Sequence, residues 1–170
     1  DMEFSARINH ARFYDVSQGG SKVIKKQLLK MLKDDKNVDY QDQIYYALAE
    51  IANKEGDMPA AIDYLANSIK TSTTNTSQKA LSYLKRGDIY FDQPEYKKAQ
   101  ANYDSAMTIL PKEYPNYQAI ETKSKSLNAL VTNLNVIAHE DSMQVLAKMS
   151  ESERDKAIEK LMKQQEEDAR

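Results

Sequence analysis

The sequence has no cysteine, and its 170 residues include only four glycines, four prolines and two histidines. The absence of cysteine excludes disulfides, thiolate metal sites and cysteine nucleophiles. The few glycines and prolines leave few positions at which a helix has to end. No apolar run approaches the roughly 20 residues of a transmembrane helix, and no signal peptide is recognisable. The chain opens with Asp1-Met2-Glu3, and we interpret it as a piece of a longer protein.

The composition favours thin helical layers. Hydrophobic residues make up 41% of the chain and charged residues 29%, and the mean hydropathy is −0.75. These values suit exposed helices that share small cores better than one thick core. The net charge is −2 with both signs interspersed, so no general nucleic-acid or anionic-membrane surface is implied.

Two segments of the chain, residues 42–73 and 80–111, superpose as an internal repeat. Ala61 aligns with Ala99, 38 residues further along the chain, and Ala49 aligns with Gly87. Two antiparallel helices pack closely only where small residues let their backbones approach. The pattern therefore predicts two stacked helix pairs, each with a small residue on both helices.

The second segment resembles the tetratricopeptide repeat, with Tyr83 standing in for the signature tryptophan. Its other matching positions are Tyr90, Ala99, Tyr103, Ala106 and Pro111. The first segment matches less well but keeps the expected turn at Gly56-Asp57. Its departures are Ala52 for the tyrosine, Ser68 for the third small residue and Thr73 for the closing proline.

The predicted fold class is all-α: a tetratricopeptide-type helix-turn-helix array, forming a right-handed superhelix, with a long C-terminal helix and a final capping helix. We expect a single domain, residues 1–170. Its parts are a degenerate repeat at 3–38 (helices at 3–17 and 21–34), repeats at 42–75 and 80–113, a long helix at 117–149 and a C-terminal helix at 151–170 with polar turns that fray.

The segments that connect these helices, and the long helix itself, give further predictions. The polar, β-branched stretch 71–78 is a poor helix former and predicts a long loop between the repeats. Ser150 and Glu153 predict a capping box at the start of the last helix. The long helix is open to two interpretations, a solvating cap on the array or an arm that packs on a partner.

The segment 22–33 combines an apolar face with a strip of lysines. The strip consists of Lys22, Lys25, Lys26, Lys30 and Lys33. We interpret it as a solvated helix face, because no arginine or aromatic residue interleaves with the lysines. A phosphate or lipid site is the alternative.

Nothing in the sequence points to catalysis. His10 and His139 are far apart, and His139-Glu140-Asp141 are adjacent residues that point in different directions on a helix. Phosphate-binding loops, nucleophile motifs and metal-binding motifs are absent from the sequence. We predict no enzymatic activity, no cofactor and no metal.

A partner is expected on the first helix of each repeat, which lines the concave side of such an array. Tyr46 and Phe91 are the aromatic anchors that we expect to contact it. The alternative is that another helix of the same protein, such as the downstream one, covers this groove. The full predicted set is Gln43, Tyr46, Glu50, Asn53, Lys54, Leu81, Leu84, Asp88, Phe91 and Asp92.

Irregular stretches of the chain resemble one particular protein family more closely than the repeat pattern alone does. The stretches KMLKDDKNVDYQDQIYYALAEIA, SIKTSTTNTSQKALSYL, ILPKEYPNY and KSLNALVTNLNVI resemble the gliding-motility and type IX secretion lipoproteins of Bacteroidetes, of the SprE/PorW type. The resemblance implies an outer-membrane lipoprotein that faces the periplasm and takes part in protein secretion. The lipidated cysteine of that family is not in this sequence, so any membrane anchor lies outside it.

The predicted function is a non-catalytic protein–protein interaction scaffold. Its partners are other proteins, which the resemblance narrows to subunits of the secretion machinery on the periplasmic side of the outer membrane. The alternative is a repeat receptor that binds a free peptide or small ligand in the concave groove. Such a receptor needs several cations to clamp a carboxylate, and the predicted groove offers only Lys54 against Glu50, Asp88 and Asp92.

Overall fold

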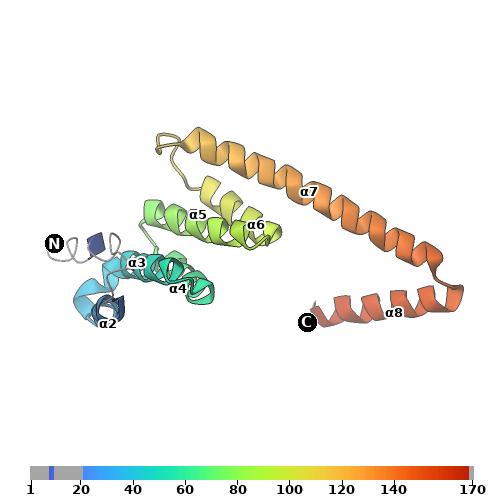
Figure 1. Cartoon of the computed structure of the whole chain (residues 1–170), viewed down its shortest axis with the longest axis horizontal. Helices are drawn as coiled ribbons and strands as arrows, with labels where there is room; N and C mark the ends of the chain where they lie inside the picture. Colours follow the sequence, from blue (N-terminus) through green and yellow to red (C-terminus); the bar gives the residue numbers. More distant parts are fainter. Residues whose placement is uncertain (1–7, 10–20, 169–170) are drawn as a thin grey trace. The chain divides into compact units, whose positions relative to one another are not determined.

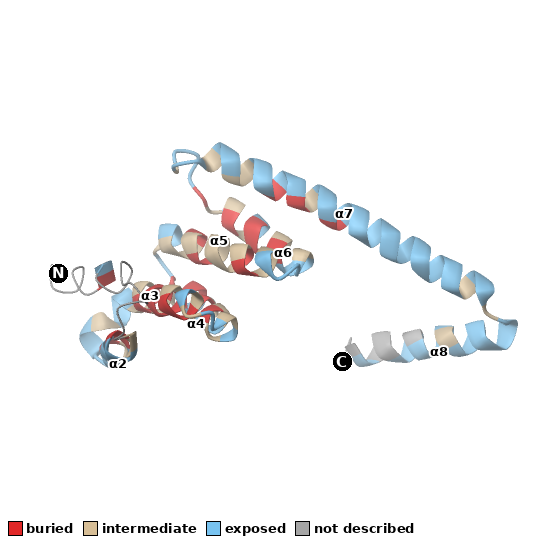
Figure 2. Cartoon of the chain, in the orientation of Figure 1, coloured by how far each residue is buried: buried red, intermediate tan, exposed pale blue. Residues whose placement is uncertain are grey.

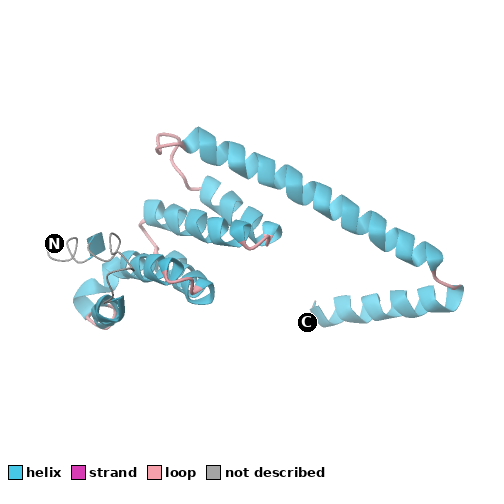
Figure 3. Ribbon diagram, in the orientation of Figure 1, coloured by secondary structure: helices cyan, strands magenta, loops and turns pink. Residues whose placement is uncertain are grey.

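The computed structural model describes residues 8–9 and 21–168, and its helices are joined by short loops (Figures 1 and 3). Over these residues there is no strand, which confirms the predicted all-α class with a long helix and a final helix. The chain divides into two compact units, residues 1–128 and 129–170. The predicted helix at 3–17 lies outside the described residues except at residues 8–9.

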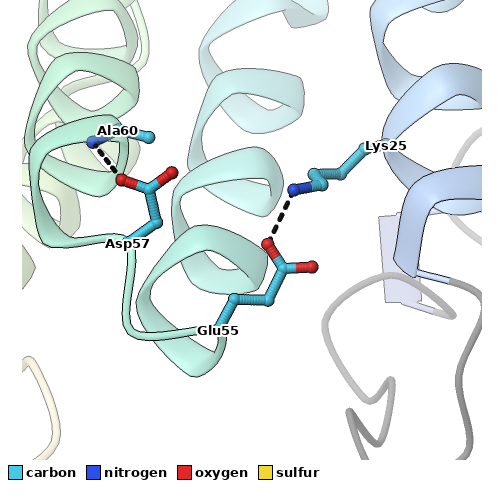
Figure 4. Close-up of polar contacts among 4 residues, drawn as sticks. All are labelled: Lys25, Glu55, Asp57 and Ala60. Atoms are coloured by element: carbon cyan, nitrogen blue, oxygen red, sulfur yellow. Dashed lines mark hydrogen bonds and ion pairs between the residues drawn. The ribbon is translucent and has the colours of Figure 1, made fainter.

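The first hairpin consists of α3 (Gln41–Lys54) and α4 (Met58–Thr71). Gly56 ends α3 with a φ of +79°, a left-handed conformation that glycine adopts without strain. The N–H of Asp57 then donates to the carbonyl of Ala52 at 2.9 Å, and that of Gly56 to Asn53 at 3.1 Å, which is the Schellman pattern. The Asp57 side chain caps α4 by accepting from the N–H of Ala60 at 3.1 Å (Figure 4). The expected Gly56-Asp57 turn therefore serves both helices.

The second hairpin consists of α5 (Thr76–Asp92) and α6 (Tyr96–Met107). The loop that precedes this hairpin is shorter than the one expected over residues 71–78, because only residues 72–75 separate α4 from α5. The side chain of Asn75 accepts from the N–H of Gln78 at 3.1 Å and caps α5. A good cap outweighs the weak helix propensity of the polar residues that follow it.

Upstream of the hairpins, α2 (Ser21–Met31) and the short 3₁₀ helix η2 (Asp35–Tyr40) replace the helix expected over residues 21–34. Ile24, Leu28 and Met31 of α2 belong to one core cluster with Ile44, Ala47, Leu48 and Ile51 of α3. Lys25 of α2 also forms an ion pair with Glu55, at 2.6 Å, at the end of α3 (Figure 4).

A second core cluster lies between the hairpins. Its buried members come from three helices: Tyr46, Ala49 and Ala52 of α3, Ala61 and Leu65 of α4, and Ile89 of α5. The aligned small residues of the second hairpin, Gly87 and Ala99, are buried as well. The small residues therefore lie where the helices approach most closely, as the repeat pattern predicts.

The joint between the two hairpins also contains a buried network of hydroxyl groups. The Ser68 hydroxyl of α4 donates to the backbone carbonyl of Asp42 at 2.7 Å and lies 2.8 Å from the Ser82 hydroxyl of α5. The Ser72 hydroxyl donates to the Asp42 carboxylate at 3.1 Å. All four side chains are almost fully buried. The sequence pattern assigned Ser68 only to a small-residue position.

Two helices complete the described chain, α7 (Tyr117–Lys148) and α8 (Glu151–Asp168). Within the first unit, α7 buries Ser124 and Leu127. Most of its later residues are exposed, as are most residues of α8 whose side chains are described (Figure 2). The Glu153 carboxylate accepts from the Ser150 N–H at 2.8 Å, which is one of the two hydrogen bonds of the expected capping box.

Candidate protein-interaction surface

The ten predicted groove residues lie on α3 and α5 as expected, but their exposure varies. Lys54 and Asp92 are exposed, and Tyr46 is buried. The half-buried members are Gln43, Glu50, Asn53, Leu81, Leu84, Asp88 and Phe91. Leu81 also packs against the core cluster between the hairpins.

The expectation for Tyr46 as an exposed anchor needs correction. Its side chain is only 8% exposed and belongs to the core cluster with Ala49, Leu65 and Ile89. The position faces the neighbouring hairpin, so burial of the ring stabilises the stack and leaves little of it for another protein. A count along one helix cannot distinguish the face toward the next hairpin from the face toward solvent.

Phe91 belongs to a cluster of acidic and aromatic side chains that receives one lysine of α7. The Lys123 Nζ lies 2.6 Å from the Asp88 carboxylate and 5.0 Å from the ring centroids of both Phe91 and Tyr103. The Tyr103 hydroxyl also donates to Asp88. We call these four residues the Lys123 cluster. It holds one ammonium group by an ion pair and two cation–π contacts.

The electrostatics of the Lys123 cluster are coupled. Burial, followed by the hydrogen bond to Asp88, raises the pKa of Tyr103 to about 12. For Lys123, burial alone lowers the pKa, but the hydrogen bonds to Asp88 and Tyr103 outweigh it and raise the pKa overall. The lysine is therefore held in its charged form.

The same stretch of α7 contacts α6. The Ser124 hydroxyl and the Asn128 side-chain amide both donate to the Asp104 carboxylate at 3.3 Å. The downstream helix thus contacts two residues of the predicted groove, Asp88 and Phe91, which remain half-buried. Sequence reasoning missed Lys123, because no local pattern marks a lysine that pairs with an acid 35 residues earlier.

The lysine strip of α2 is a second exposed surface. Val23 is 60% exposed and Leu29 is 42% exposed. They line a shallow depression together with Lys22, Lys25, Lys26, Gln27, Lys30 and Lys33. Lys25 forms an ion pair with Glu55. Hydrogen bonds from Lys25 and Ser21 lower the pKa of Glu55, and burial raises it by a smaller amount.

No candidate metal centre emerges over the part of the chain that the structure describes. No group of three or more potential metal ligands occurs there, and His139 is exposed on α7. None of the helices searched in that part is long and apolar enough to cross a lipid bilayer.

A family model described as a tetratricopeptide repeat-like domain matches residues 6–129, most of the chain. This chain is a member of the tetratricopeptide repeat-like domain family. Such domains are typically non-enzymatic scaffolds that mediate protein–protein interactions. The match covers α2 to α6 and the part of α7 that contacts the second hairpin. No curated protein matches the sequence.

Proposed function

We propose that this tetratricopeptide repeat-like domain binds a partner protein across the accessible residues of α3 and α5. The observation that supports the proposal is the graded exposure of this face: Lys54 and Asp92 are exposed, and Leu84 is half-buried. Mixed apolar and charged groups of this kind suit a polar-rimmed protein contact. The groove has one lysine among three acids, which disfavours a receptor for free carboxylates.

A charge reversal on this face tests the proposal. Lys54→Glu is compared with Lys70→Glu, because Lys54 and Lys70 are both exposed and both lie in the last turn of a helix of the first hairpin. We expect Lys54→Glu to weaken co-purification of the partner from the native host and Lys70→Glu to leave it unchanged. Equal recovery with both variants would contradict the proposed face.

Phe91→Ala tests the aromatic position of the groove. Its ring contacts Tyr96 edge-on, with centroids 5.6 Å apart, and also lies under Lys123. We therefore compare it with Lys123→Ala, which removes the same internal contact but keeps the ring. A loss of partner with Phe91→Ala alone supports direct contact, and an equal loss with both variants points to the position of α7 instead.

For the cellular role, we propose a component of type IX secretion and gliding motility on the periplasmic side of the outer membrane. This finer proposal is supported by the resemblance at the PKEYPNY turn and at the long helix that follows it. Deletion of the gene in the native host is expected to abolish secretion of type IX substrates, and the intact gene to restore it. Normal secretion and motility in the deletion strain would remove the cellular role but not the scaffold.

A further inference from the structure

The outward face of α2 carries a row of lysines that have no acidic partner among the described residues. Lys22, Lys26 and Lys30 are exposed and follow one another at intervals of four residues, so they lie within about 80° of one another around the helix. Over the part of the chain that the structure describes, none of the three forms an ion pair, whereas Lys25 is paired with Glu55 at 2.6 Å. We call these three residues the lysine row.

The opposite face of α2 is already occupied by the protein core. Ile24, Leu28 and Met31 are buried in one cluster with residues of α3. For this reason α2 cannot insert an apolar face into a membrane as a free amphipathic helix does. Its outward face consists of the lysine row with Val23 and Leu29 beside it, which are 60% and 42% exposed. Attraction at this face is therefore mainly electrostatic.

The positive charge of this face is local. The whole chain has a net charge of −2, but residues 21–33 contain five lysines and no Asp or Glu. The acids that follow, Asp34 and Asp35, lie beside Lys33 and Lys36. The field of exposed charges is screened over about 10 Å at 0.1 M salt. The row therefore attracts an anionic surface only when α2 faces that surface closely.

The residue types of α2 distinguish among anionic partners. Arginine, which binds phosphate and carboxylate groups in a bidentate geometry, and aromatic residues, on which nucleic-acid bases stack, are both absent from α2. Lysine is also depleted in protein–protein interfaces. Lysines on flexible stems impose no fixed donor geometry, so they suit a surface that offers many anionic groups without a fixed arrangement. The headgroups of anionic phospholipids form such a surface.

We propose that the lysine row binds the surface of a membrane that contains anionic phospholipids, with Val23 and Leu29 at the level of the headgroups. Each lysine near such a surface strengthens binding roughly fivefold, so three lysines give a weak and reversible contact. The inference goes beyond the proposed scaffold, since it concerns α2 rather than the partner-binding face of α3 and α5. Its failure is separable from failure of the proposed function, because vesicle binding needs no partner protein and Lys54→Glu leaves the row intact.

The first test is co-sedimentation of the 170-residue chain with lipid vesicles. Wild type is expected to sediment with vesicles of equal parts phosphatidylglycerol and phosphatidylcholine at roughly 50 mM salt, and to be released at roughly 500 mM, where screening is stronger. Vesicles of phosphatidylcholine alone are expected to leave the protein in the supernatant. A chain that does not bind the anionic vesicles at low salt, or that binds both kinds of vesicle equally, would overturn the proposal.

The second test neutralises two lysines of the row. Lys26→Gln/Lys30→Gln is expected to weaken binding to the anionic vesicles roughly twentyfold. The control, Lys156→Gln/Lys160→Gln, removes the same charge at the same spacing from exposed positions of α8, where Glu159 lies between the two lysines. It is expected to change binding less than about twofold. Circular dichroism checks that both variants stay helical, and equal weakening by both would show that net charge rather than the row is responsible.

Duplex DNA serves as the competing polyanion. The lysine row has no group that stacks on bases, so DNA binding at the same salt concentration is expected to be weaker than vesicle binding. If Lys26→Gln/Lys30→Gln weakened binding to DNA and to anionic vesicles equally, the row would be a general polyanion surface and the assignment to lipid would be wrong.

The third test asks which helix meets the vesicle surface. The chain contains no tryptophan, so a single introduced indole reports on its own position. Leu29→Trp places it beside the row, and the control Ile158→Trp places it on α8 at a residue that is 51% exposed. Anionic vesicles are expected to shift the emission of Leu29→Trp to shorter wavelength, because the indole enters the headgroup region, and to leave that of Ile158→Trp unchanged. Equal shifts in both variants, or none in either, would contradict contact through α2.

Discussion

At the scale of single residues, Gly87 and Tyr103 lie in close contact within the second hairpin. A Cβ built on Gly87 would lie 2.8 Å and 2.9 Å from two carbons of the Tyr103 ring and 3.4 Å from the Asn102 Cβ. The Tyr103 ring cannot easily move away, because the residue is 3% exposed and its hydroxyl donates a hydrogen bond to Asp88. At the aligned positions the first hairpin has Ala49, which is larger than Gly87, and Leu65, which is smaller than Tyr103.

Gly87→Ala is therefore expected to destabilise the protein, although alanine is the better helix former. The propensity gain is about 0.5–1 kcal/mol, and overpacking of a buried contact costs about 1–3 kcal/mol. We expect the free energy of unfolding in urea to fall by about 1–2 kcal/mol. The control is the same substitution in a Tyr103→Leu background, which reproduces the alanine–leucine pair of the first hairpin. There Gly87→Ala is expected to be neutral or stabilising, and an equal loss in both backgrounds would contradict the steric argument.

The raised pKa of Tyr103 has a consequence at alkaline pH. The neutral phenol is favoured in the folded state, where the pKa is about 12, against about 10 for an unperturbed tyrosine. Between these two values the unfolded chain loses the proton and the folded chain keeps it, so this residue lowers the free energy of unfolding as pH rises from about 10 to about 12.

The difference in ultraviolet absorbance between wild type and Tyr103→Phe isolates this ionisation. Its midpoint is expected near pH 12, with circular dichroism at each pH to confirm that the chain is folded. Asp88→Asn removes an anion that raises the pKa and is expected to lower the midpoint. A wild-type midpoint near pH 10 in the folded protein, the unperturbed value, would mean that the phenol is not held in the cluster.

At the scale of elements, the joint between α4 and α5 depends on polar groups inside the stack. The Asp42 carboxylate is 2% exposed and accepts from the Ser72 hydroxyl and from the N–H of Gln43. A buried acceptor that loses a donor keeps the cost of its lost hydration. The joint is therefore sensitive to the loss of one hydroxyl.

Ser72→Ala is expected to lower the free energy of unfolding by about 1–3 kcal/mol. The comparison is Ser77→Ala, on an exposed serine in the first turn of α5, where we expect a change within about 0.5 kcal/mol. In a double-mutant cycle with Asp42→Ala, a coupling of about 0.5–3 kcal/mol is expected. Additive effects of the two substitutions would show that the hydrogen bond contributes nothing to the stability of the joint.

Helix periodicity and capping residues predicted most of the elements. The turn at Gly56-Asp57 and the cap at Ser150 follow from local residue types, because both features depend on neighbours within four positions. The short loop at residues 72–75 was missed, since the capping role of Asn75 competes with the poor propensity of the threonines around it. The break of α2 at Met31 was also missed, and α2 ends where Asp34 caps a 3₁₀ helix by accepting from the Lys36 N–H.

At the scale of the whole molecule, the two units differ in how their helices are held. In the first unit α3 contributes buried residues to two core clusters. In the second unit α8 has no buried residue among the side chains that are described, and only Ala157 is half-buried. Its local contacts include the Ser150–Glu153 hydrogen bond at its start and the exposed Lys163–Glu159 pair at 3.0 Å.

Amide hydrogen exchange is therefore expected to separate the two units. The amides of α3 should exchange at rates close to those of global unfolding, and those of α8 should exchange orders of magnitude faster, because exposed helices open locally. Mass spectrometry of peptides from both regions measures this exchange. Equal protection of α3 and α8 would contradict the difference in packing.

The candidate surface was harder to predict than the fold. Sequence counting placed the ten predicted groove residues on α3 and α5, but it could not see that Tyr46 faces the neighbouring hairpin. It also could not see that Lys123 reaches Asp88. Both facts depend on how separate helices pack in three dimensions, which residue types along one helix do not encode.

The hydroxyl contact between Ser68 and Ser82 bears on how a chain of similar helices avoids stacking wrongly while it folds. If α5 slipped by one turn along α4, the position that Ser82 fills would receive Gln78 or Arg86, whose long polar side chains do not fit a fully buried gap. Repeated elements are prone to such misassembly. A small polar contact that only one alignment satisfies rejects the misaligned stacks early, so the chain has less opportunity to be trapped in them.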